Sequence, residues 1–263
     1  MVSGTARRTF AAAGVLAAIV GGAVIARADD PSATSAQSRD GGLAISPLRI
    51  ERPAAAGAAD TVRVTNNSSL ALDVEVNARP WRQASDGETR ANRRGTLGGV
   101  RLSEREFELA PGATKDVTLT LTGGGHLYGA LEVIGLPADL SERKGIVAGY
   151  RLISPLRYTP AEPKSSFKTG AAKVVGKGKN RTLTLTLRNT GNTIEPVSGN
   201  VRLRSSFGTR NVSVKALRIL PRKSVRVPLL SGNRLRPGKY TAAIRLTQAG
   251  ERTSLTKRIT VRR

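Results

Sequence analysis

The sequence contains no cysteine, a single histidine and few aromatic residues, which make up 3% of its 263 positions. Without cysteine, disulfide bonds contribute nothing to stability. The one histidine, His126, follows three glycines in a predicted loop, so we expect neither a catalytic triad nor a metal site built from several histidines. Few aromatic side chains means few stacking platforms for nucleic acid. We therefore expect no enzyme, no cofactor, no metal and no nucleic-acid partner.

Long apolar runs are also missing, except for one near the N-terminus. Residues 10–25 are apolar and rich in small residues, follow Arg7 and Arg8, and are succeeded by Ala26-Arg27-Ala28. This arrangement is typical of an export signal, and the run is short for a membrane span, which needs ~20 residues. We predict a signal peptide over 1–28, with an uncleaved anchor as the alternative, and no transmembrane segment in the mature chain. Sec and twin-arginine export both stay open, and we expect an extracytoplasmic location: periplasm, cell wall or secreted.

The strongest pattern that is present is an internal repeat of short alternating strands. Residues 61–134 contain TVRV, LALDVEV, FELAPGATKDVTLTL and LYGALEVIG, and residues 183–246 contain LTLTLRN, VRLR, LRILPRKSVRVPLL and PGKYTAAIRL in the same order. Pro111 and Pro221 mark the same corner in the two copies. Units of ~100 residues with this rhythm are typical of immunoglobulin-like folds. The predicted fold class is all-β, two tandem immunoglobulin-like β-sandwiches after an N-terminal signal peptide.

Composition sets the expected boundaries. After the signal peptide we expect a flexible leader, a first sandwich, a Pro-containing hinge and a basic second sandwich, at residues 29–42, 43–160, 161–172 and 173–263. A polar, Gly-rich stretch at 83–99 is predicted to be a long loop. The two-residue period predicts which side chains point inward: Val62, Val64, Leu70, Leu72, Val74, Val76, Val117, Leu119, Leu121, Leu183, Leu185 and Leu187.

The charge is divided unequally between the two units. Residues 41–137 carry 11 Arg or Lys and 11 Asp or Glu, whereas residues 173–263 carry 22 Arg or Lys and only Glu195 and Glu251. Alternation predicts that four arginines share one outer face of the second sandwich: Arg202, Arg204, Arg245 and Arg258. A solvated strand face is the simplest interpretation of four arginines. Such an excess over one domain favours an anionic partner, for example an envelope polymer.

Five short segments of the first unit resemble a known family. ISPLRIE (45–51), the strand around Trp81, VRLSEREFELAPG (100–112), LYGALEVIG (127–135) and GIVAGYRLISPLRYTP (145–160) have the order and spacing of a PapD-like pilus chaperone. The resemblance implies that the first domain binds an extended polypeptide by adding a strand at its own edge strand, 146–156. The implied peptide-binding edge consists of Ile146, Ala148, Tyr150, Leu152 and Leu156.

The same resemblance implies an anchor for a terminal carboxylate in the cleft, made by an Arg and a Lys. Arg49 matches the Arg, but the Lys position falls at about Pro155, so Arg151 or Arg157 would have to substitute for it. The two-domain order is also similar to secreted cell-surface proteins that interact with WxL proteins, whose second domain the stretch RNTGN (188–192) resembles. That second resemblance implies a role at the cell wall.

Two hypotheses follow from the sequence. The first is a non-catalytic, chaperone-like or adaptor protein of the cell envelope that binds an envelope polypeptide along 146–156. The alternative is a wall- or surface-associated protein whose basic second domain binds an anionic wall polymer.

Overall fold

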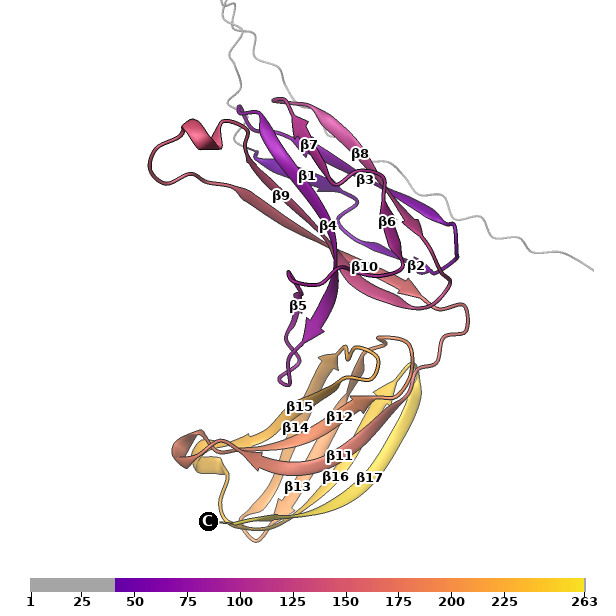
Figure 1. Cartoon of the computed structure of the whole chain (residues 1–263). Helices are drawn as coiled ribbons and strands as arrows, with labels where there is room; N and C mark the ends of the chain where they lie inside the picture. The colour runs from indigo at the N-terminus through magenta and orange to yellow at the C-terminus, as the bar shows by residue number, and fades with distance from the viewer. Residues whose placement is uncertain (1–40, 263) are drawn as a thin grey trace, which may run out of the picture. The chain divides into compact units, whose positions relative to one another are not determined.

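The computed structural model describes residues 41–262 (Figure 1). The predicted signal peptide and all but the last two residues of the predicted leader lie outside this range. The described chain forms two β-sandwiches in sequence, so the all-β, two-sandwich prediction is confirmed. In this range no helix is long and apolar enough to cross a membrane.

The first sandwich consists of a four-stranded sheet in the order β1-β3-β8-β6 and a second sheet in the order β2-β10-β9-β4-β5, with β7 also paired to β4. A short 3-10 helix, η1 (Leu140–Glu142), lies between β9 and β10. The strands are β1 (Leu43–Ser46), β2 (Ile50–Pro53), β3 (Ala59–Asn66), β4 (Leu72–Gln83), β5 (Thr89–Ala91), β6 (Val100–Leu102), β7 (Glu106–Leu109), β8 (Thr114–Leu121), β9 (Leu127–Pro137) and β10 (Tyr150–Thr159).

The second sandwich consists of a three-stranded sheet, β11-β12-β15, and a four-stranded sheet, β14-β13-β16-β17. Two 3-10 turns, η2 (Gly178–Asn180) and η3 (Gly232–Arg234), connect its strands. The strands are β11 (Phe167–Val175), β12 (Thr182–Asn189), β13 (Val197–Ser205), β14 (Gly208–Leu217), β15 (Ser224–Ser231), β16 (Gly238–Gln248) and β17 (Glu251–Val261).

Each sandwich has its own apolar core between its two sheets. Alternation along the strands produces these cores, because successive side chains point to opposite faces of a sheet. Eleven of the twelve side chains that alternation predicts to point inward are at most 2% exposed: Val62, Val64, Leu72, Val74, Val76, Val117, Leu119, Leu121, Leu183, Leu185 and Leu187. The prediction is wrong for Leu70, which is 38% exposed because it lies in the bend before β4 and not in the alternating strand.

One corner is built the same way in both sandwiches. The buried amide of Asn66 donates to the carbonyls of Leu70 (2.7 Å) and Leu109 (2.9 Å). Asn189 repeats this role in the second sandwich and donates to Thr193 O (2.7 Å) and Ile219 O (2.6 Å). Each Asn therefore ties the end of one strand to the Pro corner that follows later in its own sandwich. The sequence repeat thus reflects repeated hydrogen bonding as well as repeated strands.

Two segments differ from the sequence-based expectation. The stretch 83–99, expected to be a loop, contains β5, which pairs with the end of β4 in a short hairpin. The second sandwich begins at β11, so residues 167–172 of the expected hinge already belong to a strand. The sequence did not predict β5 or the start of β11, because both segments are polar and contain glycine. Their pairing depends on a neighbouring strand rather than on apolar alternation.

Candidate functional site

The candidate peptide-binding edge lies on β10, which has a neighbour along its whole length on one side only. β9 pairs with it from Tyr150 to Tyr158. On the other side β2 pairs only with Leu156 to Thr159, in parallel. Within residues 41–262, no strand pairs with β10 on this side between Tyr150 and Pro155. We call this unpaired stretch the open edge.

The chain between β1 and β2 explains why the open edge ends where it does. β1 pairs with β3 in one sheet, and β2 pairs with β10 in the other. The crossing segment contains the cis peptide bond Ser46-Pro47, and the Pro47 carbonyl lies 3.5 Å from the hydroxyl of Ser154. The chain therefore reaches β10 beside Ser154 and covers it only from Leu156 onward.

Alternation along β10 shows which backbone groups face the open edge. The carbonyl of Thr159 accepts from the Ala54 N–H at 2.6 Å, on the β2 side. Since backbone groups alternate between the two sides of a strand, odd-numbered residues point to the β2 side and even-numbered residues to β9. Arg151 and Ile153 thus present both N–H and C=O groups to the open edge. Pro155 presents only C=O, which fits the restriction of proline to edge positions.

The five residues of the predicted edge fall into three environments. Ile146 and Ala148 are exposed and lie before β10, which begins only at Tyr150. Tyr150 and Leu152 are part-buried against the core. Leu156 is 0% exposed and opposite β2, so it packs in the protein's own core and is not free to fill a partner's pocket.

Gly42 explains how Tyr150 is held. Its φ of 59° lies in the left-handed region that favours glycine, and a Cβ on it would lie 2.4 Å from the Tyr150 ring. The ring therefore rests directly on the Gly42 backbone. This contact fixes the first residue of β10, while the residues before it have no strand partner in the described chain.

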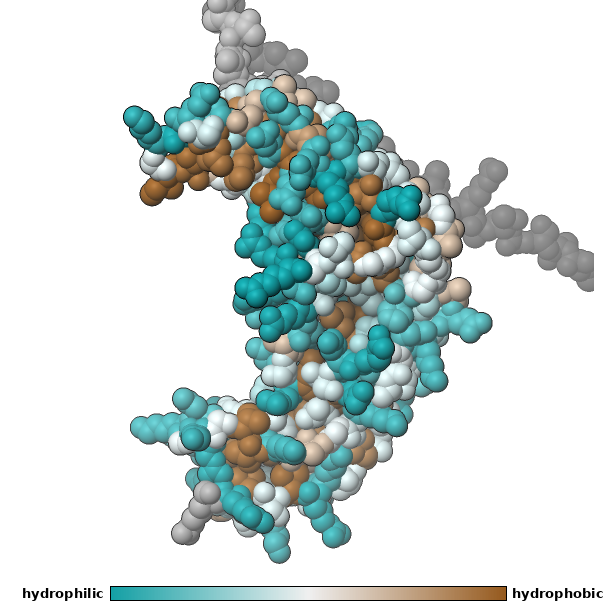
Figure 2. Space-filling view, in the orientation of Figure 1, coloured by the Kyte–Doolittle hydropathy of each residue, from teal (hydrophilic) through white to brown (hydrophobic). Residues whose placement is uncertain are grey.

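Exposed apolar side chains flank the open edge. Leu136 lies near the end of β9, and Leu140 and the fully exposed Ile146 come from the segment around η1 that joins β9 to β10. Figure 2 shows hydrophobic side chains gathered over this segment. Leu48, which is 76% exposed, comes from the chain between β1 and β2. Apolar surface thus lies at both ends of the uncovered stretch.

Arg49, the predicted anchor, lies close to Arg157, one of the two arginines that could substitute for the missing Lys. Its Nε is 3.5 Å from the carboxylate of Glu51, which also accepts from Arg157 at 3.1 Å. The parallel pairing of β2 with β10 sets Glu51 beside Arg157. Two arginines therefore share one carboxylate, and one positive charge is left over. Arg157, not Arg151, is the arginine that accompanies Arg49.

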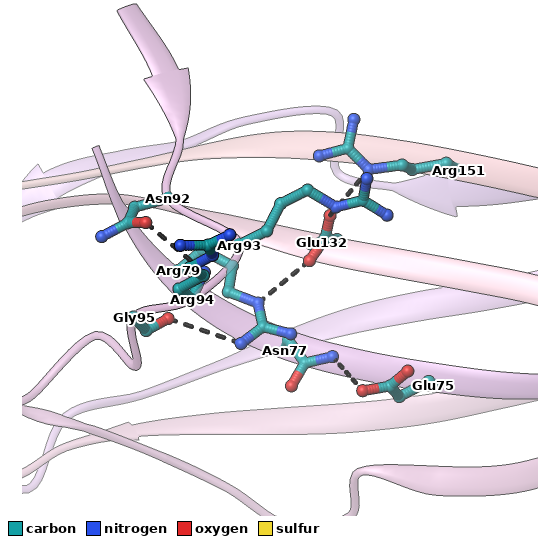
Figure 3. A network of polar contacts seen from close by, with 9 residues as sticks. All are labelled: Glu75, Asn77, Arg79, Asn92, Arg93, Arg94, Gly95, Glu132 and Arg151. Carbon is teal, nitrogen blue, oxygen red and sulfur yellow. Dashed lines mark hydrogen bonds and ion pairs between the residues drawn. The ribbon is translucent and has the colours of Figure 1, made fainter. Parts of the chain in front are cut away.

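Arg151 belongs to a different cluster, around Glu132 (Figure 3). The Glu132 side chain is 1% exposed and accepts from Arg79 at 2.9 Å and Arg151 at 2.7 Å, while Arg93 lies 3.8 Å away. Burial raises the pKa of Glu132, but the hydrogen bonds from Arg151 and Arg79 outweigh burial and hold the pKa below its usual range. The cluster fixes the Arg151 side chain on the sheet, beside the open edge. Glu132 is not among the residues predicted from the sequence, where its only signal is a lone carboxylate in the apolar run LYGALEVIG.

The predicted basic face lies on the sheet β14-β13-β16-β17. Arg202 and Arg204 on β13 and Arg245 on β16 line one hollow of about 590 Å³. Arg258 on β17 lies opposite Thr241, which lines the same hollow. All four arginines are exposed. Among residues 41–262 no group of acidic or histidine side chains is arranged to hold a metal ion.

Comparisons with known proteins agree with this architecture. No protein-family model and no curated protein matches the chain. A chain from a chaperone–tip adhesin complex of CFA/I fimbriae biogenesis is similar with a TM-score of 0.51 and 17% identity, over 82% of this chain and 98% of that one. The class 5 fimbriae chaperone CfaA is similar with a TM-score of 0.49 and 14% identity, over 82% of this chain and 98% of that one. The E. coli chaperone DraB is similar with a TM-score of 0.42 and 15% identity, over 84% of this chain and 98% of that one. The similarity shows a PapD-like chaperone fold of two immunoglobulin-like domains.

Proposed function

We propose that this protein is a non-catalytic, extracytoplasmic protein of the chaperone or adaptor type, and that it binds an extended polypeptide along the open edge of β10. The open edge carries the proposal. Exposed strand edges are templates for pairing with another chain, and native proteins usually cover or disrupt them. Here β2 covers only the end of β10, while no strand of the described chain pairs with the stretch up to Pro155 on that side.

Strand addition needs backbone groups for affinity and side-chain contacts for specificity. The N–H and C=O groups of Arg151 and Ile153 supply the first. The exposed Leu48, Leu136 and Ile146 supply apolar contacts at both ends of the edge. A polypeptide with alternating apolar residues is therefore the expected partner, in keeping with the chaperone–tip adhesin complex to which the fold is similar.

The Arg49–Glu51–Arg157 group suits an anionic end of such a partner. The group contains two arginines but only one carboxylate, and the Arg49 side chain is 62% exposed. A carboxylate entering from solvent can therefore contact Arg49 without displacing Glu51 from Arg157. This group is the anchor that we propose for a chain terminus or an acidic side chain.

Replacing Ile153 with proline tests the proposal at one atom. Ile153→Pro removes the N–H that faces the open edge and leaves the pairing with β9 intact, as Pro155 already does two residues later. Ile153→Ala is the matched control, because it shortens the same side chain but keeps the N–H. The exported protein would be isolated from its own envelope at high salt, and retained polypeptides would be identified and quantified by mass spectrometry.

We expect Ile153→Pro to lower retention of a specific polypeptide about tenfold, in line with the loss of a backbone hydrogen bond in a tightly packed strand. Ile153→Ala should retain most of it. Equal retention by the two variants, with both folded by circular dichroism, would contradict strand addition. Failure of the chain to retain any polypeptide would contradict the proposed function as a whole.

A further inference from the structure

The second sandwich has a feature that polypeptide binding at β10 does not use. All ion pairs among residues 41–262 join groups of the first sandwich. The second sandwich contains only two acidic residues, Glu195 and Glu251, and neither lines the hollow on its four-stranded sheet. Its arginines therefore face solvent without a carboxylate partner. Clustered unpaired charges of one sign attract ligands of the opposite sign.

Register brings the charges of this face together. Across β13, β16 and β17, Arg204, Thr241 and Arg258 lie in one row. Four residues along the strands, Asn200 and Arg245 lie in a parallel row. Paired residues of antiparallel strands point to the same side of a sheet, and the alternate residues Tyr240, Ala242, Ile244 and Leu246 are buried. The cationic side chains therefore share the outer face.

Small side chains between the arginines create the hollow. Ala243 lies opposite Arg202 at its centre, and Arg202, Arg204 and Arg245 form its walls. Hydroxyl and amide groups complete the lining: Asn200, Asn211, Thr241 and Thr256. The hollow thus offers guanidinium forks, which bind phosphate oxygens through two hydrogen bonds, together with neutral donors for further oxygens.

The basic surface continues beyond the hollow. Lys239 and Arg252 occupy outward positions at opposite ends of β16 and β17 and are exposed. Along β13, Arg202 and Arg204 are two residues apart, a distance of ~7 Å in a strand. A polymer whose repeat contains six backbone bonds, like two peptide residues, also advances at most ~7 Å per repeat. A chain of three-carbon polyols joined at their terminal oxygens by phosphodiesters has such a repeat.

We propose that this face is a second binding site, for a linear polymer that carries one phosphodiester per repeat. The lining of the hollow sets the chemistry, because it contains no aromatic side chain to stack on bases and no apolar side chain larger than Ala243 to enter a lipid bilayer. The ligand is therefore recognised through its charged backbone. This site is independent of the open edge of β10 and would let the protein be held in a phosphate-rich envelope layer while β10 is free for a polypeptide.

The test uses a fluorescent oligomer of about a dozen propane-1,3-diol phosphates, which has the six-bond repeat and no bases. Its binding to the purified full chain would be followed by fluorescence anisotropy at increasing salt. The test variant is Arg202→Gln/Arg204→Gln/Arg245→Gln. The matched control is Lys168→Gln/Lys173→Gln/Arg188→Gln, which removes the same charge from exposed positions of the other sheet of this sandwich.

We expect the test variant to bind about tenfold more weakly, because it loses three exposed charge contacts. The slope of log K against log salt concentration should become less steep by about two, since each lost contact removes ~0.7 from it. The control variant should change affinity less than twofold. Equal losses in the two variants would show attraction by net charge alone and overturn the site. Tighter binding of poly-glutamate or of phosphatidylglycerol vesicles than of the oligomer, at matched charge, would overturn the choice of a phosphodiester polymer.

Discussion

The two sandwiches have the same fold but differ in how their charged side chains are arranged. In the first, carboxylates and arginines pair with one another, as at Glu132, and the strand edge of β10 is left open. In the second, the sheet strands carry arginines with hardly any carboxylates among them. The common corner at Asn66 and Asn189 shows that this difference does not come from a different fold. We therefore expect function at the features that the two sandwiches do not share, which are the open edge of β10 and the arginine face of the second sandwich.

The shared corner is the first part of the comparison to test. Asn66→Ala removes a buried amide and leaves the carbonyls of Leu70 and Leu109 without this donor. We expect it to lower the free energy of unfolding of the first sandwich by about 2–4 kcal/mol, measured by calorimetry. Asn189→Ala should do the same in the second sandwich. Asn67→Ala is the control in the same turn, and an effect of only one of the two buried Asn residues would refute the equivalence of the corners.

The charge clusters of the first sandwich give the next largest effect. Glu132→Gln leaves the part-buried Arg79 without its counter-charge, and we expect a loss of about 2–3 kcal/mol in the free energy of unfolding. Glu75→Gln, which changes an exposed carboxylate on the neighbouring strand, should change it little. Denaturant unfolding of the two variants measures the difference. A loss of the same size in both would mean that burial of the charge is not what matters.

The pH dependence of the same variant separates charge from shape. Because the pKa of Glu132 is lowered on folding, its carboxylate stabilises the protein fully above the usual value of 4.5, and the contribution is lost as the pH falls through the lower folded value. The difference in unfolding free energy between wild type and Glu132→Gln should therefore be constant near neutral pH and shrink in acid below that value. A difference that stays constant into strong acid would assign the effect to packing.

The smallest effect sharpens the comparison at one backbone position. After the corner prolines, Gly112 has a φ of 77° and Arg222 a φ of 64°. A residue with a side chain is strained there. Arg222→Gly should therefore raise the free energy of unfolding by about 0.5–1 kcal/mol, and Gly112→Ala should lower it. Both changes would be measured as shifts of the melting temperature. Arg222→Ala controls for the removed charge. Equal gains from Arg222→Gly and Arg222→Ala would assign the gain to charge rather than to backbone strain.

Local pattern predicted most of the scaffold. Alternation correctly placed side chains such as Val64 and Leu185 in the cores, although it failed for Leu70 in the bend before β4, and the repeated Pro positions indicated two similar units. Alternation could not show that β2 returns to cover β10 from Leu156 onward, because that pairing joins residues about 100 positions apart. It also could not show that Arg151 and Arg157 belong to different carboxylates. Both depend on which strands become neighbours.

The most direct test of the central claim is hydrogen exchange at single backbone amides of β10, followed by NMR. In the free protein, the Arg151 and Ile153 amides should exchange much faster than those of Leu152 and Ser154, which face β9. When the retained polypeptide is bound, the Arg151 and Ile153 amides should become protected. Protection of these two amides in the free protein, or no change on binding, would contradict an open edge that accepts a strand.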